Sequence, residues 1–165
     1  MPNAIRTLLL AVMFALGAGG ASSGPIEDGA AAYIRKDYAT ALSLWRPVAE
    51  QGDANTQHLV GIMYESGQGV LQDYAEAAKW YRQAADQGDI GAQYSLGVLY
   101  DKGRGVVQDY VQAHKWYNLV AAVSSGPEGA KAQKDRDKIA AKMTPAQIAE
   151  AQKSAREWKP VTGAK

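Results

Sequence analysis

The chain has 165 residues, 18 Lys and Arg against 17 Asp and Glu, 47% hydrophobic residues and no cysteine. This composition describes a folded globular protein and excludes a disordered or collagen-like chain. The near-zero net charge gives no electrostatic reason to expect nucleic-acid binding, which needs a concentrated basic face. Many glycines and alanines with a single Phe favour closely packed helices over a β-sandwich.

Residues 1–21 are typical of an export signal. Arg6 precedes the apolar run Leu8–Leu16, and small residues follow at positions 17–21. The run is about half the length that a membrane-spanning helix needs, so we expect no stable membrane anchor. We predict cleavage near Ala21 and a protein that is periplasmic or secreted, with a retained signal segment as the alternative.

An internal repeat of 36 residues dominates the rest of the chain. Residues 37–72 and 73–108 share 16 of 36 positions when aligned without gaps, and a third copy opens at Asp109 before it diverges. A period in the mid-thirties is typical of stacked helical hairpins, in which no unit buries its apolar face alone.

Each repeat contains two helices separated by helix-ending residues. Asp73 is an N-cap for a helix that ends before Gly88, and Asp89 caps the next helix, which ends at Gly103. Gly97 lies inside this second helix, where glycine costs about 1 kcal/mol relative to alanine, so we expect it to allow close approach of a neighbouring aromatic side chain.

The flanks extend the same pattern. Residues 26–35 form the first helix of a shortened hairpin, and Glu128–Lys142 and Pro145–Trp158 form two final helices, the last opened by a Thr144 capping box. We therefore divide the chain into a signal peptide (1–21), a partial repeat (22–36), two full repeats (37–72 and 73–108), a degenerate repeat with C-terminal capping helices (109–158) and a tail (159–165).

Pro47 lies inside the helix expected over residues 38–51. It cannot donate to the Ser43 carbonyl, and its ring crowds that carbonyl, so we predict a helix kinked near Ser43–Pro47 rather than one that ends early. The register match of residues 49–52 with residues 85–88 favours continuation.

The repeated positions resemble Sel1-like repeats, which are relatives of the tetratricopeptide repeats. The positions that carry this resemblance are Gln57/Gln93, Gly61/Gly97, Tyr64/Tyr100, Gly67/Gly103, Gly69-Val70/Gly105-Val106 and the following Asp73-Tyr74/Asp109-Tyr110. The resemblance covers roughly residues 26–158. It implies an all-α, α/α solenoid (superhelix) of about four helical hairpins, with the Gln/Gly/Tyr helices on the concave side. It also implies an adaptor for protein partners, in envelope signalling, stress regulation or host contact.

The residues give little support for chemistry. His58 and His114 lie in different repeats without cysteine or a second spaced histidine, so we expect no metal site and no cofactor. Serine and cysteine nucleophile motifs are absent from the sequence, and we predict a protein that is not an enzyme, with no catalytic residues.

The remaining polar and apolar positions of the Gln/Gly/Tyr helices predict a binding strip. If Gln57, Gly61 and Tyr64 pack inward, helical spacing turns the neighbouring positions outward. The alternative for Ile62 and Val98 is that they only contact the adjacent helix. We predict that a protein or peptide with an apolar stripe and basic ends binds there to a monomer, because residues 37–108 carry nine acids and five bases. A cell-wall-active or small-molecule-binding protein that uses the same groove is the alternative. The candidate partner-binding residues are Asn55, His58, Ile62, Glu65, Tyr94, Val98 and Asp101.

Overall fold

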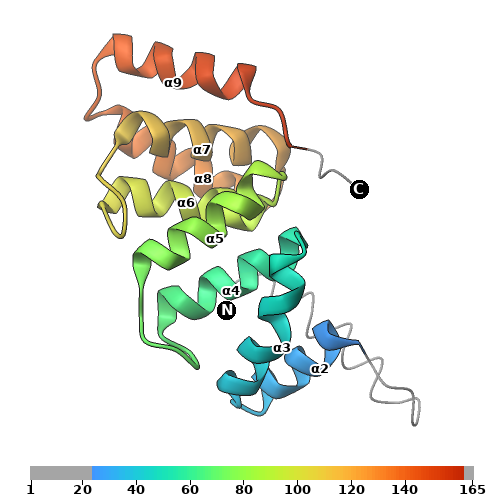
Figure 1. The fold of residues 1–165 in the computed structure, drawn as a ribbon. Coiled ribbons are helices and arrows are strands. Elements are labelled where there is room, and N and C mark those ends of the chain that lie inside the picture. The colour runs from blue at the N-terminus through green and yellow to red at the C-terminus, as the bar shows by residue number, and fades with distance from the viewer. Residues whose placement is uncertain (1–23, 162–165) are drawn as a thin grey trace.

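The computed structural model describes residues 24–161 and is all-helical over this range (Figure 1). The helices are α2 Pro25–Ile34, α3 Tyr38–Glu50, α4 Ala54–Ser66, α5 Tyr74–Asp86, α6 Ile90–Lys102, α7 Tyr110–Val123, α8 Pro127–Ala140 and α9 Pro145–Glu157. From α2 to α7 each helix packs on the one before it, and α8 and α9 both pack against α7. This arrangement confirms the predicted solenoid of about four hairpins. The predicted signal peptide lies outside the described residues.

Aspartates begin the helices of the repeats, as the sequence predicts. Asp73 accepts from the amides of Ala75 and Glu76, and Asp89 accepts from the amide of Ala92. The helices α4 and α6 end at Gly67 and Gly103, both in the left-handed conformation. The predicted capping box at Thr144 is also present. Local side-chain chemistry therefore fixes where these helices start and stop.

Close contacts between a glycine and an aromatic ring join the two helices of three hairpins, which are α2 with α3, α4 with α5 and α6 with α7. A Cβ built at Gly61 would lie 2.6 Å from the Tyr81 ring, and one at Gly97 would lie 2.8 Å from Tyr117. A Cβ at Gly29 of α2 would lie 2.3 Å from Trp45 of α3. Glycine is therefore required at these positions so that the ring can rest on the backbone of the facing helix, which confirms the role expected for Gly97.

The loops between the helices stack along one edge of the solenoid. A side chain at Gly105 would clash with the backbone of Tyr74, and one at Gly69 would clash with Tyr38 in the same way. Each loop thus lies on the start of the second helix in the preceding hairpin. The adjacent Val70 and Val106 pack against the core, as expected, which anchors the loops.

The helix α3 continues through Pro47 to Glu50 and matches the 13 residues of α5. Pro47 therefore does not end the helix, as the repeat register predicted. Its ring leaves the Ser43 carbonyl without an amide donor four residues later. A kink at this point stays a prediction.

The last two helices both pack against α7. Ile139 of α8 joins Ala113 and Tyr117 in a second core cluster, and Tyr94 and Val98 of α6 pack against that cluster. On α9, the buried residues are Ala151 and Ala155. The other positions of α9 are mostly polar and solvent-facing, as expected for a segment that ends a stack of repeats.

We expect Gly97→Leu to lower the free energy of unfolding by about 1–3 kcal/mol, because its side chain overpacks the contact with Tyr117. Chemical denaturation followed by circular dichroism measures this change. Ala122→Leu is the matched control, because it also enlarges a helical side chain, at an exposed position of α7. Equal unfolding midpoints for the two variants would contradict the role assigned to Gly97.

Candidate partner-binding surface

The predicted binding strip comes from two neighbouring helices. Helix α4 carries Asn55, His58, Ile62 and Glu65, and α6 carries the remaining residues, Tyr94, Val98 and Asp101. Of these seven residues, Asn55 is exposed, His58 is buried and the other five are half-buried. The outward orientation expected from helical spacing therefore holds only in part.

His58 is buried, with 3% of its surface exposed, so the prediction that it faces a groove is wrong. Helix α6 covers it: a Cβ at Gly91 would lie 2.2 Å from the His58 ring. Its Nδ1 lies 3.1 Å from Oδ1 of Asp89, and its ring meets the Tyr81 ring edge-on. His58 is thus part of the contact between successive repeats.

Tyr94 and Val98 are covered in the same way by α8. Both pack against the cluster that contains Ile139, and the Tyr94 hydroxyl donates to Asp135 at 2.5 Å. The Lys131 ammonium lies 4.7 Å from the centre of the Tyr94 ring. The prediction that these two side chains stand free in a groove is wrong, because α8 follows α6 as α6 follows α4. Ile62 likewise packs against the core.

Half-buried carboxylates lie along this face, and the Asp101 side chain is 12% exposed. Glu65 lies in the last turn of α4 and accepts from the Tyr81 hydroxyl at 2.5 Å. Its counterpart one repeat later, Asp101, pairs with Lys102 at 2.9 Å. Burial, with the charge of Glu65, raises the pKa of Tyr81 far above its usual value, so this phenol stays a neutral donor. The strip is therefore an acidic edge, defined here by Glu65, Asp101 and Asp135, above buried tyrosines.

Asp135 and Lys131 of α8 belong to this surface, and the sequence analysis missed them. Their helix has lost most of the repeat pattern, so no aligned position pointed to them. The position of α8 as the first helix of the fourth hairpin could have identified them. Because α6 packs over His58 of α4, the first helix of a fourth hairpin should pack over Tyr94, the equivalent position of α6.

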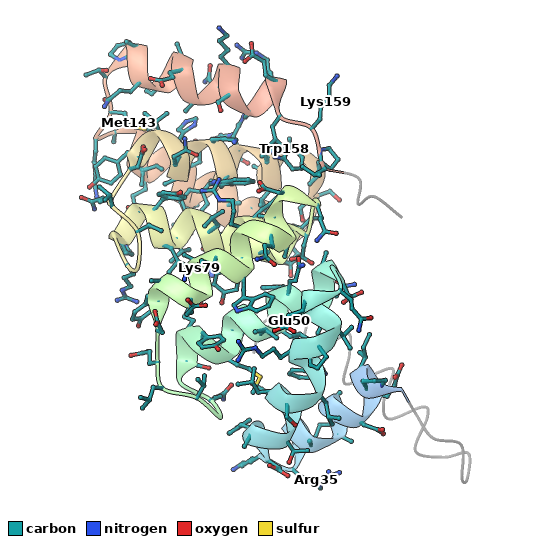
Figure 2. The ribbon with its side chains drawn as sticks, viewed as in Figure 1. Arg35, Glu50, Lys79, Met143, Trp158 and Lys159 are labelled. Carbon is teal, nitrogen blue, oxygen red and sulfur yellow. The ribbon has the colours of Figure 1, made fainter. Side chains whose placement is uncertain are left out.

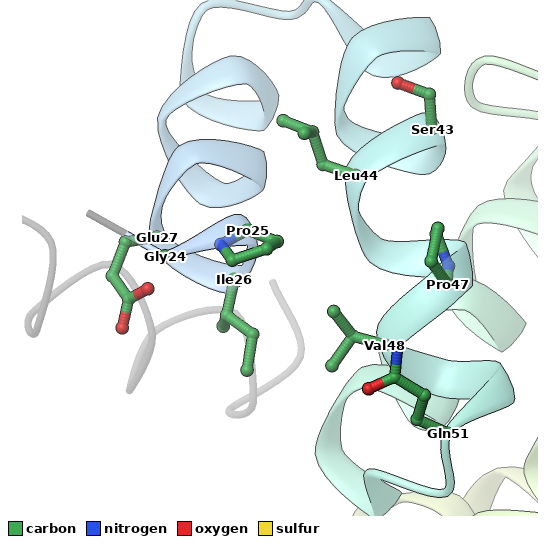
Figure 3. Close-up of a pocket in the computed structure, with 9 residues that line it drawn as sticks. All are labelled: Gly24, Pro25, Ile26, Glu27, Ser43, Leu44, Pro47, Val48 and Gln51. Atoms are coloured by element: carbon green, nitrogen blue, oxygen red, sulfur yellow. The ribbon is translucent and has the colours of Figure 1, made fainter. Parts of the chain in front are cut away.

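A cleft at the other end of the solenoid was not predicted. It lies between the start of α2 and the second half of α3 and has a volume of about 440 Å³ (Figure 3). Apolar side chains line most of it, and Glu27 and Ser43 also contribute. It is lined by Gly24, Pro25, Ile26, Glu27, Ser43, Leu44, Pro47, Val48 and Gln51. Pro47 and Ser43, between which the kink is predicted, therefore both line this cleft.

The histidines show no metal-binding geometry. Within residues 24–161, no group of three His, Cys, Asp or Glu side chains is placed to hold a metal ion. Burial and the nearby Arg136 lower the pKa of His114, so this ring is neutral at pH 7. In the same part of the chain, no helix is long and apolar enough to cross a membrane.

The Sel1 repeat model matches residues 10–53, 54–89 and 90–122, which together cover more than half of the sequence. The chain belongs to the Sel1 repeat family. Sel1 repeats generally form scaffolds for protein–protein interaction. Comparison with curated proteins gave no match.

Two solved structures share this fold. One is a protective antigen present in uropathogenic Escherichia coli strains that displays an SLR fold, with 30% identity and a TM-score of 0.72. The match covers 79% of this chain and 28% of the antigen, so the chain spans less than a third of that protein. The other is a Sel1 repeat protein from Oxalobacter formigenes, with 38% identity, a TM-score of 0.55 and coverage of 60% of this chain and 71% of that one.

We expect Tyr94→Phe to lower the free energy of unfolding by about 1 kcal/mol, because the variant loses the hydrogen bond to Asp135 and keeps the packed ring. Tyr94→Ala loses both and should cost more. Thermal or chemical unfolding measures both variants. The control is Tyr94→Phe in an Asp135→Ala background, where the bond is already absent and the additional loss should vanish. An unchanged stability for Tyr94→Ala would show that Tyr94 is not a packed residue.

Proposed function

We propose that this chain is an exported, non-enzymatic Sel1 repeat scaffold that binds a protein or peptide in the periplasm or outside the cell. The observation that carries the proposal is the acidic edge, where equivalent ends of α4 and α6 present Glu65 and Asp101 one repeat apart. Repetition of a charged group at a fixed spacing suits an elongated partner that contacts several repeats at once.

The chemistry of this edge selects the kind of partner. Glu65 and Asp101 share their helices with Ile62 and Val98, whose side chains pack against core clusters but keep part of their surface exposed. A partner segment with a short apolar stripe and basic ends would complement both features. Because the acids are solvent-exposed in part, their main effect is on partner choice and association rate, and raised salt should weaken binding.

The proposed location outside the cytosol rests on the first 21 residues and on one structural relative. Residues 1–21 have the charge and hydropathy of an export signal. The structurally similar Escherichia coli protein is a protective antigen, a description that fits a protein the host encounters. We therefore favour envelope signalling or host contact over a cytosolic role.

A small-molecule or cell-wall ligand is the second candidate. The cleft bordered by Pro47 has a volume of about 440 Å³, within the usual range for small-ligand sites (Figure 3). Its walls are mostly apolar and supply few converging polar groups. An extended, repeated edge therefore supports protein binding better than this cleft supports a small ligand.

Partner binding should decrease at least severalfold in the Glu65→Gln, Asp101→Asn double variant. The substitutions remove two charges from the acidic edge and keep side chains of similar size that can still accept hydrogen bonds. The measurement is capture from an envelope extract, with identification of the retained proteins and titration of the main one. The control, Glu150→Gln with Glu157→Gln, removes two exposed carboxylates from α9. Equal capture by both double variants would contradict binding at the acidic edge.

Export predicts that the mature protein begins near Ser22. Expression of the full sequence in a bacterium, followed by fractionation and N-terminal sequencing, measures both location and cleavage. We expect the shortened chain in the periplasm or medium, and an Arg6→Glu, Leu10→Arg variant should accumulate uncleaved because the signal features are lost. Full-length wild-type protein confined to the cytosol would contradict the proposed location.

A further inference from the structure

The segment after α9 folds back over the surface of two earlier repeats. The Trp158 ring meets the Trp116 ring of α7 edge-on, with centres 6.2 Å apart. The Val161 amide then donates to the carbonyl of Asp86 at the end of α5, at 2.7 Å. Figure 2 shows Trp158 and Lys159 where the chain leaves α9 and passes the end of α7. We call residues 158–161 the tail strap.

One residue, Trp158, makes most of the packing contacts of the tail strap. Lys159, Pro160 and Val161 are exposed, and only Trp158 is half-buried. Trp158 packs against the main core cluster and meets the Trp116 ring, whereas the rest of the tail strap is held by one backbone hydrogen bond and by the approach of Pro160 to Gly88. Such a segment can be displaced without unfolding the helices beneath it.

The surface under the tail strap carries positive charge around an indole ring. The Arg82 guanidinium lies 5.3 Å and the Lys115 ammonium 4.5 Å from the centre of the Trp116 ring. Among residues 24–161, no carboxylate oxygen lies within 4 Å of either cation, although Asp86 is near enough to act on both electrostatically. Two cations thus share one nearby acid.

Trp116 also has an unused hydrogen-bond donor. Its side chain is fully buried, and Nε1 has no hydrogen-bond partner among the described residues. Most buried polar atoms in folded proteins are hydrogen-bonded, so such a donor marks a place that an acceptor can complete. The Trp158 ring packs edge-on against this indole, and no residue of the tail strap accepts a hydrogen bond from Nε1.

We propose that Arg82, Lys115 and Trp116 form a second binding site, for an extended peptide that carries an aromatic residue next to an acidic one, and that the tail strap covers this site until such a peptide displaces it. The incoming aromatic side chain takes the place of Trp158 on Trp116. The acidic side chain meets the two cations that lack an ion pair. This site lies on α5 and α7 and does not depend on the acidic edge of α4 and α6.

The test uses the full mature chain and two fluorescein-labelled peptides with the sequence of residues 155–165. One peptide has the natural sequence, and the other carries Lys159→Glu. We expect the Lys159→Glu peptide to bind the Trp158→Ala chain about tenfold more tightly than the unsubstituted chain, because the substitution weakens the internal competitor. Val123→Ala, which trims an exposed side chain elsewhere on α7, should behave like the unsubstituted chain.

A second pair of variants tests displacement without removing an aromatic ring. Val161→Pro removes the amide that donates to Asp86, whereas Val161→Ala keeps it. We expect tighter peptide binding only in Val161→Pro. Equal peptide affinity in the unsubstituted, Trp158→Ala and Val161→Pro chains, with folding confirmed by circular dichroism, would overturn the proposal. Failure of either peptide to bind any chain would overturn it as well.

The preference for an acidic peptide is tested by comparing the affinities of the two peptides. The Lys159→Glu peptide should bind the Trp158→Ala chain severalfold more tightly than the natural peptide, and an added Lys115→Met should remove most of this difference. Equal affinity of the two peptides would refute the acidic specificity. Because envelope capture through the acidic edge is a separate measurement, failure of one experiment is distinguishable from failure of the other.

Discussion

The contact between a glycine on one helix and an aromatic ring on the next is the constraint on which this solenoid depends. Gly61 with Tyr81, and Gly97 with Tyr117, place a ring directly on a helix backbone in two successive repeats. The rings are fully or almost fully buried, and much of the remaining core is alanine. Because the ring position sets how closely the two helices approach, repetition of this pair gives successive hairpins the same internal geometry.

A buried glutamine fastens each hairpin to the one before it. The Gln57 amide donates to the Ala49 carbonyl at 3.0 Å, and Gln93 donates to Ala85 at 3.2 Å. Gln57 in turn accepts from Gln87 at 2.8 Å. The glutamine amide is a second donor to a carbonyl in the last turn of the preceding helix, which also accepts from the backbone amide of Gly52 or Gly88. In each repeat, a glycine therefore allows the two helices of a hairpin to approach closely, and a glutamine links the hairpin to the preceding one. Both residues recur after 36 positions.

The sequence predicts the local structure well, because caps and close contacts depend on residues near one another. Asp73, Asp89 and Thr144 start helices as expected, and Gly97 meets an aromatic ring. The binding strip was less predictable. Helical spacing identifies a second face on α4 and α6, but it does not say whether solvent or the next repeat covers that face. His58 and Tyr94 are buried by α6 and α8, and the α8 sequence has diverged too far from the repeat to reveal this.

Loss of the repeat pattern at the C-terminal end has a physical consequence for binding. A stack of identical hairpins leaves an uncovered face on its last unit, and here α8 covers α6 while the tail strap covers part of α7 and α5. The two covers differ in strength. Helix α8 contributes the fully buried Ile139 to a core cluster, whereas the tail strap is held by one half-buried side chain, Trp158, and one hydrogen bond, and its other residues are exposed. Only the weakly held cover can be exchanged for another peptide at modest cost, and the charges beneath it decide which peptide that is.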